Sequence, residues 1–319
     1  MIATRNRISF DPELIRRYDL RAPRYTSYPS ADHFENNFTE KHYRQAAVTS
    51  NEIPIPSALS LYFHIPFCNS LCFFCACNKV VTRRTEVADE YLDYLCQEIQ
   101  LQGGLYDNDR EVVQLHLGGG TPTFLTMNQI KRLLQKVDQH FLLSTSPDRD
   151  FSIEIDPRTV ALESLESLRQ LGFNRISLGV QDFEPKVQQA IHRIQPAEAT
   201  LELLQYAKDI GFESINVDLI YGLPHQTFET FNRTLELLMT APPDRLSVFN
   251  YAHLPCRFPP QRRIHGKDLP SAEEKLTILE TCVHWLTTAG YSYIGIDHFA
   301  RPEDPLAHAQ LNGTLGRNF

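Results

Sequence analysis

The most informative segment of the chain is Leu59-Ser-Leu-Tyr-Phe-His-Ile-Pro-Phe-Cys-Asn-Ser-Leu-Cys-Phe-Phe-Cys-Ala-Cys-Asn-Lys79. Its first seven residues alternate apolar and polar side chains, which is typical of a strand with two different faces. Three cysteines follow closely, Cys68, Cys72 and Cys75, and Cys77 comes two residues later. The stretch therefore predicts a strand that leads into a loop able to hold a metal centre.

The cysteine loop leaves three interpretations open. A disulfide is disfavoured, because residues 1–7 contain no apolar segment of a secretory signal and a reducing compartment keeps thiols free. A zinc site could use the four clustered cysteines, but structural zinc usually takes two separated ligand pairs. An iron–sulfur cluster on three thiolates would keep one iron open for another ligand. The other cysteines stand singly and are expected to be buried thiols: Cys96, Cys256 and Cys282.

The overall composition bounds the class of protein. The chain has 319 residues, 42% of them hydrophobic and 22% charged, which suits one large domain with an extension or two smaller domains. Its formal net charge of −8 argues against nucleic acid as the main partner, because phosphate binding normally shows as a basic excess. No apolar run approaches the length of a membrane span. We therefore expect a cytoplasmic protein without nucleic-acid or membrane partners.

Beyond residue 57 the sequence repeats a strand, a loop and an amphipathic helix. This alternation predicts parallel strands joined by helical crossovers. Residues 88–99 illustrate the helices, since apolar side chains recur there at steps of three and four, and a further helix is predicted at about 271–289. The strands are predicted at about 59–65, 112–117, 151–155, 175–180, 214–219 and 245–251.

The predicted strands have one apolar and one polar face. In the first strand Leu61 and Phe63 share one face, while Tyr62 and His64 share the other. Parallel strands covered by helices on both faces are usually apolar throughout, so a polar face indicates a polar cavity. Six such strands predict an α/β fold that is a partial, laterally open (β/α)6 TIM-like barrel, unlike the filled core of a closed barrel.

Chemically suggestive residues fall at the carboxyl end of each predicted strand. In α/β barrels this rim is where active sites are built. A glycine triplet is weak evidence by itself, because it can be only a tight turn. The rim residues, in strand order, are the cysteine loop, Gly118-Gly119-Gly120-Thr121-Pro122, Glu154 with Asp156, Gln181 with Asp182, Asp218, and Tyr251-Ala252-His253.

Together these motifs resemble the radical S-adenosylmethionine (SAM) enzymes. Further stretches are similar to one family among them, the oxygen-independent coproporphyrinogen III oxidases, also called coproporphyrinogen dehydrogenases. The resemblance runs from about Arg24 to the last residue. It rests on His64-Ile-Pro-Phe-Cys68, Cys77-Asn-Lys79, Ile153-Glu-Ile-Asp-Pro157, Gly179-Val-Gln-Asp182, Asp218-Leu-Ile-Tyr-Gly-Leu-Pro224, Phe249-Asn-Tyr-Ala-His-Leu-Pro255 and Asp297-His-Phe-Ala300.

The resemblance implies a [4Fe–4S] cluster on Cys68, Cys72 and Cys75, whose open iron would bind SAM. In this family, one-electron reduction cleaves SAM to a 5′-deoxyadenosyl radical, which abstracts a hydrogen from a propionate of coproporphyrinogen III. Loss of CO2 and one electron gives a vinyl group, and two such reactions give protoporphyrinogen IX. The expected cofactors are the cluster and one or two SAM molecules. The expected partners are coproporphyrinogen III and an electron donor such as flavodoxin or ferredoxin, and the chain is expected to be a monomer.

The same resemblance implies which residues contact SAM. Contacts to the cluster-bound SAM are implied for Tyr62, Gly119 and Glu154. An inward carboxylate can bind a ribose diol or an ammonium group, and an arginine can fork to a carboxylate. Arg193 falls at the end of a helix predicted from Glu184 to Ile191 and just beyond, so a solvated surface arginine is the alternative there. A second SAM would contact Phe74, Gly120, Thr121, Gln181, Arg193, Asp218 and Ala252.

Two features favour the oxidases over the related haem chaperones, which share the fold and the cluster motif without the oxidase activity. One is Cys77, which is not expected to be a ligand. The other is Arg24-Tyr-Thr-Ser-Tyr-Pro29, similar to a segment that lies over the active site, so Arg24 and Tyr25 are candidate substrate contacts. We predict an irregular arm with a short helix and this substrate-covering segment at 1–57, followed by the radical SAM barrel at 58–300.

The carboxyl end departs from the family pattern. Family members continue well past the position of Phe319, through a glycine-rich segment that touches SAM and a domain that covers the open barrel. We therefore expect a truncated chain in which residues 301–319 begin the C-terminal region and the covering domain is missing. A haem chaperone-like paralogue and an inactive fragment of the oxidase are the alternatives to an active enzyme.

Overall fold

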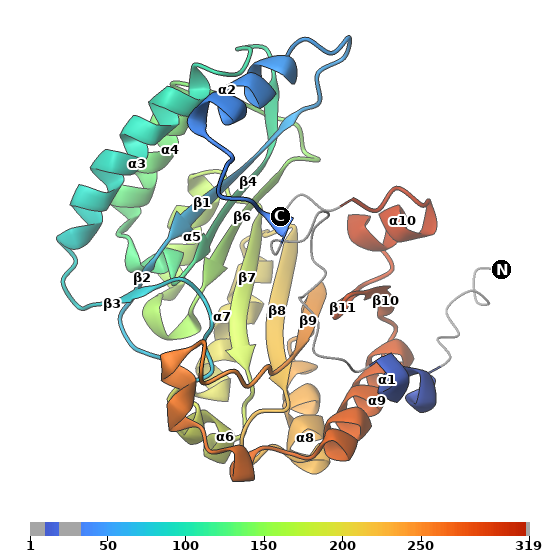
Figure 1. Ribbon diagram of the computed structural model, residues 1–319. Helices are drawn as coiled ribbons and strands as arrows, with labels where there is room; N and C mark the ends of the chain where they lie inside the picture. Colours follow the sequence, from blue (N-terminus) through green and yellow to red (C-terminus); the bar gives the residue numbers. More distant parts are fainter. Residues whose placement is uncertain (1–9, 19–32, 317–319) are drawn as a thin grey trace.

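A curved, nine-stranded sheet forms the centre of the computed structural model, which describes residues 10–18 and 33–316 (Figure 1). Its strands are β1 (Leu59–Ile65), β4 (Glu111–Gly119), β5 (Leu142–Leu143), β6 (Asp150–Ile155), β7 (Arg175–Gln181), β8 (Ser214–Tyr221), β9 (Arg245–Asn250), β10 (Ser292–Gly295) and β11 (His298–Ala300). Along the sheet they follow the order β1, β4, β6, β7, β8, β9, β11, β10, while β5 pairs with β4 beside this path.

The six predicted strands are confirmed as β1, β4, β6, β7, β8 and β9, and every neighbouring pair among them is parallel. In the described part of the chain β1 and β10 are the two edges of the sheet and do not pair, so the barrel is partial and open at the side. The alternation of strands and helices did not predict the hairpin of β10 and β11, which adds to β9 in antiparallel fashion. These strands have four and three residues, too few to show a clear period of two.

Helices follow the strands and run along the outer side of the curved sheet (Figure 1). The apolar faces of the strands and helices meet in one large core, in which Leu92, Leu133 and Leu235 are completely buried. This arrangement explains why each strand is apolar on one face only. The helices between strands are α3 (Val87–Gly103), α4 (Met127–Asp138), α5 (Leu162–Gln170), α6 (Pro185–Ala190), α7 (Ala197–Asp209), α8 (Phe228–Leu238) and α9 (Ala272–Thr288).

Helix starts follow local sequence signals. Thr126 precedes α4, and its hydroxyl accepts a hydrogen bond from the backbone of Gln129, whose side chain in turn accepts one from the backbone of Thr126. Ser271 and Glu274 form the same reciprocal pair before α9. Each pair satisfies backbone N–H groups that the first helical turn leaves open, so these helices begin where the sequence predicts.

The amino-terminal region contributes two helices to the described part of the chain, α1 (Pro12–Tyr18) and α2 (Glu40–Thr49), where we predicted one. Arg16 of α1 forms an ion pair of 2.7 Å with Glu273 of α9. Tyr43 of α2 donates a hydrogen bond to Gln102 of α3. Arg24 and Tyr25, the candidate substrate contacts, lie outside the described residues.

At the other end, α10 (Pro305–Leu311) packs beside the edge hairpin. The Gln310 amide donates hydrogen bonds of 2.9 Å to the carbonyls of Tyr293 and Ile294. Asp304, which caps α10, also accepts hydrogen bonds from Arg245 at the start of β9. Residues 301–316 are thus joined to the sheet. Among the described residues, no helix has the length and apolar character needed to cross a bilayer.

Candidate active site

The cysteine loop is held at the carboxyl end of β1 by two short strands, β2 (Phe67–Cys68) and β3 (Val80–Val81), which pair in parallel. The Val80 N–H donates to the Pro66 carbonyl at 2.7 Å, so the two ends of the loop are joined. Cys68 and Cys72 are buried and Cys75 is half-buried. All three line one cavity of about 530 Å³ at the carboxyl ends of the strands.

The loop is also held from the far side of the barrel. The residues after α6 contact it through two hydrogen bonds, from the Phe73 N–H to the Ile191 carbonyl and between His192 and the Leu71 carbonyl. The rings of Phe73 and His192 stack with centroids 4.9 Å apart. His192 adopts a positive φ of 56°, which is uncommon for a residue with a side chain. These contacts fix Cys72 between β1 and β7.

Cys75 and Cys77 differ in the charge that their surroundings favour. A hydrogen bond from Cys77 is the main cause that lowers the pKa of the Cys75 thiol, and the nearby Lys79 ammonium adds to it. The same hydrogen bond raises the pKa of Cys77. Burial raises the pKa of Cys68, whose sulfur accepts a hydrogen bond of 3.5 Å from Thr121. Cys75 is therefore the more readily ionised of the adjacent pair.

The donor set suits a cluster better than one metal ion. In the described ranges, no three side chains among His, Cys, Asp and Glu converge as ligands of a single ion. A [4Fe–4S] cluster needs one thiolate on each of three irons, so its ligands surround a cavity instead of meeting at a point. All seven cysteines are free thiols. Cys282 is buried, as predicted, and Cys96 is half-buried. The prediction of a buried Cys256 is wrong, because this residue lies in the exposed loop after β9.

The glycine triplet ends β4 beside the cysteine loop. Gly119 has φ of 120°, a conformation that residues with a Cβ rarely adopt, and its N–H donates to the Glu154 carboxylate at 3.1 Å. A Cβ on Gly120 would lie 2.8 Å from the backbone of Pro66. The triplet thus allows the backbone after β4 to lie directly against the cysteine loop.

Two carboxylates, Glu154 and Asp218, occupy one half of the cavity. Asp218 accepts hydrogen bonds from Ser177 at 3.0 Å and Asn216 at 2.8 Å, and both partners are neutral. Burial raises the pKa of Asp218 to about 6, and the negative charge of Glu154 adds to the shift. His116 lies 3.5 Å from Glu154. This half of the cavity therefore presents negative charge or acceptor oxygens to a ligand.

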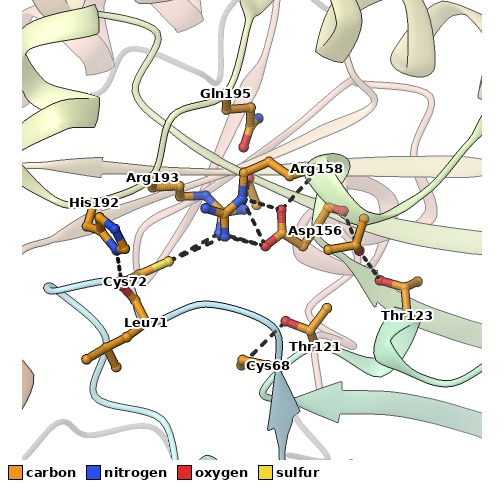
Figure 2. Close-up of polar contacts among 12 residues, drawn as sticks. Cys68, Leu71, Cys72, Thr121, Thr123, Asp156, Arg158, His192, Arg193 and Gln195 are labelled. Atoms are coloured by element: carbon orange, nitrogen blue, oxygen red, sulfur yellow. Dashed lines mark hydrogen bonds and ion pairs between the residues drawn. The ribbon is translucent and has the colours of Figure 1, made fainter. Parts of the chain in front are cut away.

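Two arginines occupy the other half, around Cys72 (Figure 2). Asp156, at the end of β6, accepts hydrogen bonds from Arg158 at 2.6 Å and Arg193 at 3.1 Å. Burial alone would raise the pKa of Asp156, but the hydrogen bond from Arg158 and the charge of Arg193 outweigh it and hold that pKa below its ordinary value. Asp156 is therefore ionised and fixes both guanidinium groups.

The position of Arg193 corrects the predicted helix. Helix α6 ends at Ala190, so Arg193 lies in the following loop, and its side chain is only 8% exposed. It is not the solvated surface arginine that the sequence left open. Its Nη2 donates to the Gly179 carbonyl at 2.6 Å, whereas its buried Nε has no partner among the described residues. A buried donor without a partner suits a site that receives a polar ligand such as a SAM carboxylate.

Gln181 is also placed by the backbone. It ends β7 with φ of 69° at a shift in the register between β7 and β8, and its side chain is buried. The cavity contains most of the residues predicted from the resemblance to contact cofactors. They are Phe74, Gly119, Gly120, Thr121, Glu154, Gln181, Arg193 and Asp218, besides the three cysteines.

Two predicted SAM contacts do not line this cavity. Tyr62 on β1 is half exposed, donates or accepts a hydrogen bond of 3.0 Å with His64, and stacks on His116. Ala252 is exposed in the loop after β9, and its carbonyl accepts a hydrogen bond from Gln261. Sequence reasoning assigned no role to Arg158, although its spacing from Asp156 in an Asp-Pro-Arg turn is a local signal for a contact between the two.

This fold and site define a class. The chain belongs to the radical SAM superfamily, whose family model matches residues 62–238. It is 53% identical to the oxygen-independent coproporphyrinogen III oxidase of Salmonella typhimurium, over 98% of this chain and 67% of the relative. It is 49% identical to the Pseudomonas aeruginosa protein of the same name, with the same coverage. Within the superfamily, the chain belongs to the family of oxygen-independent coproporphyrinogen III oxidases.

Solved structures agree with this assignment. The chain superimposes on coproporphyrinogen III oxidase from Escherichia coli, described as a radical SAM enzyme, with a TM-score of 0.90 and 50% identity. The superposition covers 98% of this chain and 68% of that structure. The predicted partial barrel is thus the fold of a relative of known structure, and the family implies a [4Fe–4S] cluster and SAM as cofactors.

Proposed function

We propose that this chain catalyses the oxidative decarboxylation of two propionates of coproporphyrinogen III to vinyl groups, giving protoporphyrinogen IX. One observation carries the proposal: the thiols of Cys68, Cys72 and Cys75 line the same cavity as the glycine loop and the Glu154 and Asp218 carboxylates. When bound, the cluster and SAM supply a 5′-deoxyadenosyl radical, and the protein supplies binding, orientation and exclusion of water.

We assign the cluster to Cys68, Cys72 and Cys75 and not to Cys77. Cys75 is half-buried whereas Cys77 is exposed, which supports this choice. Around the cluster, the Gly119 N–H holds the Glu154 carboxylate in place, so that Glu154 presents an acceptor to a ribose or an ammonium group of SAM. Gln181, Asp218 and Arg193 lie where they would hold polar groups of SAM from the opposite strands.

We propose that SAM also contacts Tyr62 and Ala252 at the edge of the cavity. Tyr62 lies on β1, and Ala252 lies in the loop just after β9. The cavity residues all fall between residues 58 and 300, which supports the division into an amino-terminal arm at 1–57, a barrel at 58–300 and a C-terminal region from 301. We propose that Arg24 and Tyr25 of the arm contact the substrate. We also propose that the protein acts as a monomer.

We propose that the electron donor is an acidic protein such as flavodoxin or ferredoxin. The segment 257–267 carries exposed cations beside the cysteine loop, and among the described residues none of them has an ion-pair partner: Arg257, Arg262, Arg263 and Lys267. Two contacts join this segment to the loop, from Gln261 to the Phe74 carbonyl and from Arg263 to the Phe73 ring. A basic surface next to the cluster site would attract an acidic donor.

A salt titration tests this docking surface. Arg262→Glu should slow reduction by flavodoxin several-fold at low salt and weaken the salt dependence, because an anion replaces one of the four cations of the surface. Arg233→Glu on α8 is the matched control, since Arg233 is also exposed but pairs with Glu184 away from the loop. Equal salt dependence in Arg262→Glu and the parent chain would contradict the proposed surface.

The seven free thiols support a reducing compartment, and we propose that the protein works in the cytoplasm. The activity is tested by anaerobic reconstitution with iron and sulfide, followed by assay of 5′-deoxyadenosine with and without coproporphyrinogen III. Substrate-dependent 5′-deoxyadenosine together with a vinyl product supports the oxidase. Stable haem binding without turnover would indicate a haem chaperone instead.

Two variants test the ligand assignment in the same preparation. Cys72→Ala should abolish the visible absorbance of the cluster, because each of three irons needs its own thiolate. Cys77→Ala should leave that absorbance intact, since Cys77 is exposed and is not a proposed ligand. Equal loss in both variants would show a site with four thiolates and contradict the assignment.

A further inference from the structure

Arg158 is fixed by a rigid turn at the end of β6. Pro157 begins the short 3-10 helix η3 (Pro157–Thr159), and the Asp156 carboxylate accepts hydrogen bonds from the backbone N–H of Arg158 at 3.1 Å. The same carboxylate accepts from Nε of Arg158 at 2.9 Å and from Nη2 at 2.6 Å. Backbone and guanidinium are thus held by one carboxylate, so the side chain has little freedom to turn elsewhere.

The fixed guanidinium points at the sulfur of Cys72 (Figure 2). Nη2 of Arg158 donates to Sγ of Cys72 at 3.5 Å, and Nη1 of Arg193 donates to the same sulfur at 3.6 Å. The two arginines come from different loops, yet they share both Asp156 and Cys72 as partners. One carboxylate therefore aims two cations at one cysteine.

The cluster of side chains beside Cys72 carries more positive than negative charge. Two guanidinium groups face one carboxylate, which leaves one positive charge in excess. The side chains are largely buried, with exposed fractions of 20% for Arg158, 9% for Asp156 and 8% for Arg193. Both guanidinium groups are held by hydrogen bonds at this depth, and beyond Asp156 they share one further acceptor. That acceptor is the sulfur of Cys72, towards which both cations point.

We propose that Arg158 is a positioning residue for Cys72, which orients its thiolate and makes the bound cluster easier to reduce. This inference rests on the proposed cluster at Cys68, Cys72 and Cys75. Hydrogen bonds to ligand sulfurs and nearby positive charge both favour the more negative, reduced state. Reduction here adds one electron from an external one-electron reductant to the cluster, with no bond or proton transferred.

The role falls on Arg158 more than on Arg193 because Arg193 also reaches the Gly179 carbonyl and has a proposed contact with SAM. The polar partners of Arg158 in the described part of the chain are Asp156 and Cys72. Nothing in this geometry requires Arg158 to touch SAM or substrate. Its effect should therefore appear in the cluster before any SAM is added.

The experiment measures the midpoint potential of the reconstituted cluster by a dithionite titration followed by electron paramagnetic resonance, without SAM or substrate. Arg158→Gln removes the charge and keeps a side chain that can bond to Asp156. Arg158→Lys keeps the charge and loses the planar fork. Arg169→Gln is the matched control, because this arginine donates to the Gly211 and Phe173 carbonyls, away from the cysteines.

We expect Arg158→Gln to hold as much iron and sulfide as the parent chain and to be at least tenfold harder to reduce, a negative shift of 59 mV or more for one electron. The midpoint potential of Arg158→Lys should lie between those of the parent chain and Arg158→Gln. The midpoint potential of Arg169→Gln should equal that of the parent chain. A potential for Arg158→Gln within the range of the parent and the control would overturn the inference.

Two further outcomes are decisive. If Arg158→Gln fails to hold a cluster, Arg158→Lys is measured: a negative shift supports the inference, and the parent potential overturns it. If the parent chain itself holds no cluster, the proposed function fails and the inference fails with it. A cluster in the parent with no effect of Arg158 contradicts the inference alone.

Discussion

Asp156 and Asp218 are two carboxylates at the same rim with opposite surroundings. Asp156 lies between two guanidinium groups, which hold its pKa below the ordinary value. Asp218 is surrounded by the neutral side chains of Ser177 and Asn216, and burial raises its pKa to about 6. Asp156 directly follows the end of β6 and Asp218 lies within β8, and both line one cavity.

These surroundings give the two carboxylates different roles. Asp156 is fully satisfied by the protein and serves to position cations around Cys72. Asp218 is held in place but not neutralised, so folding leaves it in an unfavourable state that a cationic or hydroxyl-bearing ligand would relieve. Asp156 thus serves the cluster ligand through the arginines around Cys72, whereas Asp218 is left for a polar cofactor.

Asp156→Asn, in the chain without cofactors, should have the largest effect on the contrast between the two carboxylates. The variant leaves Arg158 and Arg193 buried without a counter-charge, so we expect a loss of about 3–5 kcal/mol in the free energy of unfolding. Urea unfolding followed by circular dichroism measures it. A loss of less than about 1 kcal/mol in the free energy of unfolding would show that water already screens the two arginines. Asp156 and Asp218 would then not differ in the way described above.

The carboxylate half is tested through SAM binding. Glu154→Gln keeps the shape and removes the charge, and we expect the dissociation constant for SAM to rise about tenfold, which is about 1.4 kcal/mol. Equilibrium dialysis with anaerobically reconstituted protein measures the constant. Glu163→Gln, in the first turn of α5 and away from the cavity, is the control. Equal constants for both variants would remove Glu154 from the SAM site.

The smallest expected effect is a gain in stability, in Asp218→Asn. The pKa of Asp218 is raised from 3.8 to about 6, so its contribution to stability is present below pH 3.8 and is lost as the pH rises through 6. The shift corresponds to roughly 3 kcal/mol at pH 7.5. Because the asparagine also loses part of the hydrogen bonds from Ser177 and Asn216, we expect Asp218→Asn to be more stable than the parent by about 1 kcal/mol. The gain should shrink as the pH falls to 5, because the parent carboxyl then becomes neutral.

The difference in stability between Asp218→Asn and the parent chain is measured from urea unfolding midpoints at several pH values between 5 and 7.5. Asp156 does not mask it in this range: its pKa is lowered, so the stability it contributes is lost only as the pH falls below its ordinary value. A pH-independent difference between Asp218→Asn and the parent would mean that Asp218 is already solvated in the folded protein.

Local sequence patterns predict much of this site. Period-two alternation predicts which strand residues face the cavity, and Glu154 and Asp218 indeed lie there. The carboxyl ends of parallel strands gather at one rim, so their loops could be assigned to one site before any contact was known. Arg193 shows where prediction from local patterns fails. Periodicity predicts a helix that reaches Arg193, whereas α6 ends at Ala190, and periodicity cannot predict which distant side chains Arg193 contacts.

Residues near one another along the chain set the order of strands and helices, the polar face of the sheet and the cysteine loop, so these features could be predicted from local patterns. Which charges meet depends on the folded chain instead. Arg193 lies 37 residues from Asp156 and 121 from Cys72, and the curvature of the sheet brings them together. The pKa of a carboxyl depends on what lies within a few ångströms, and folding alone sets those neighbours.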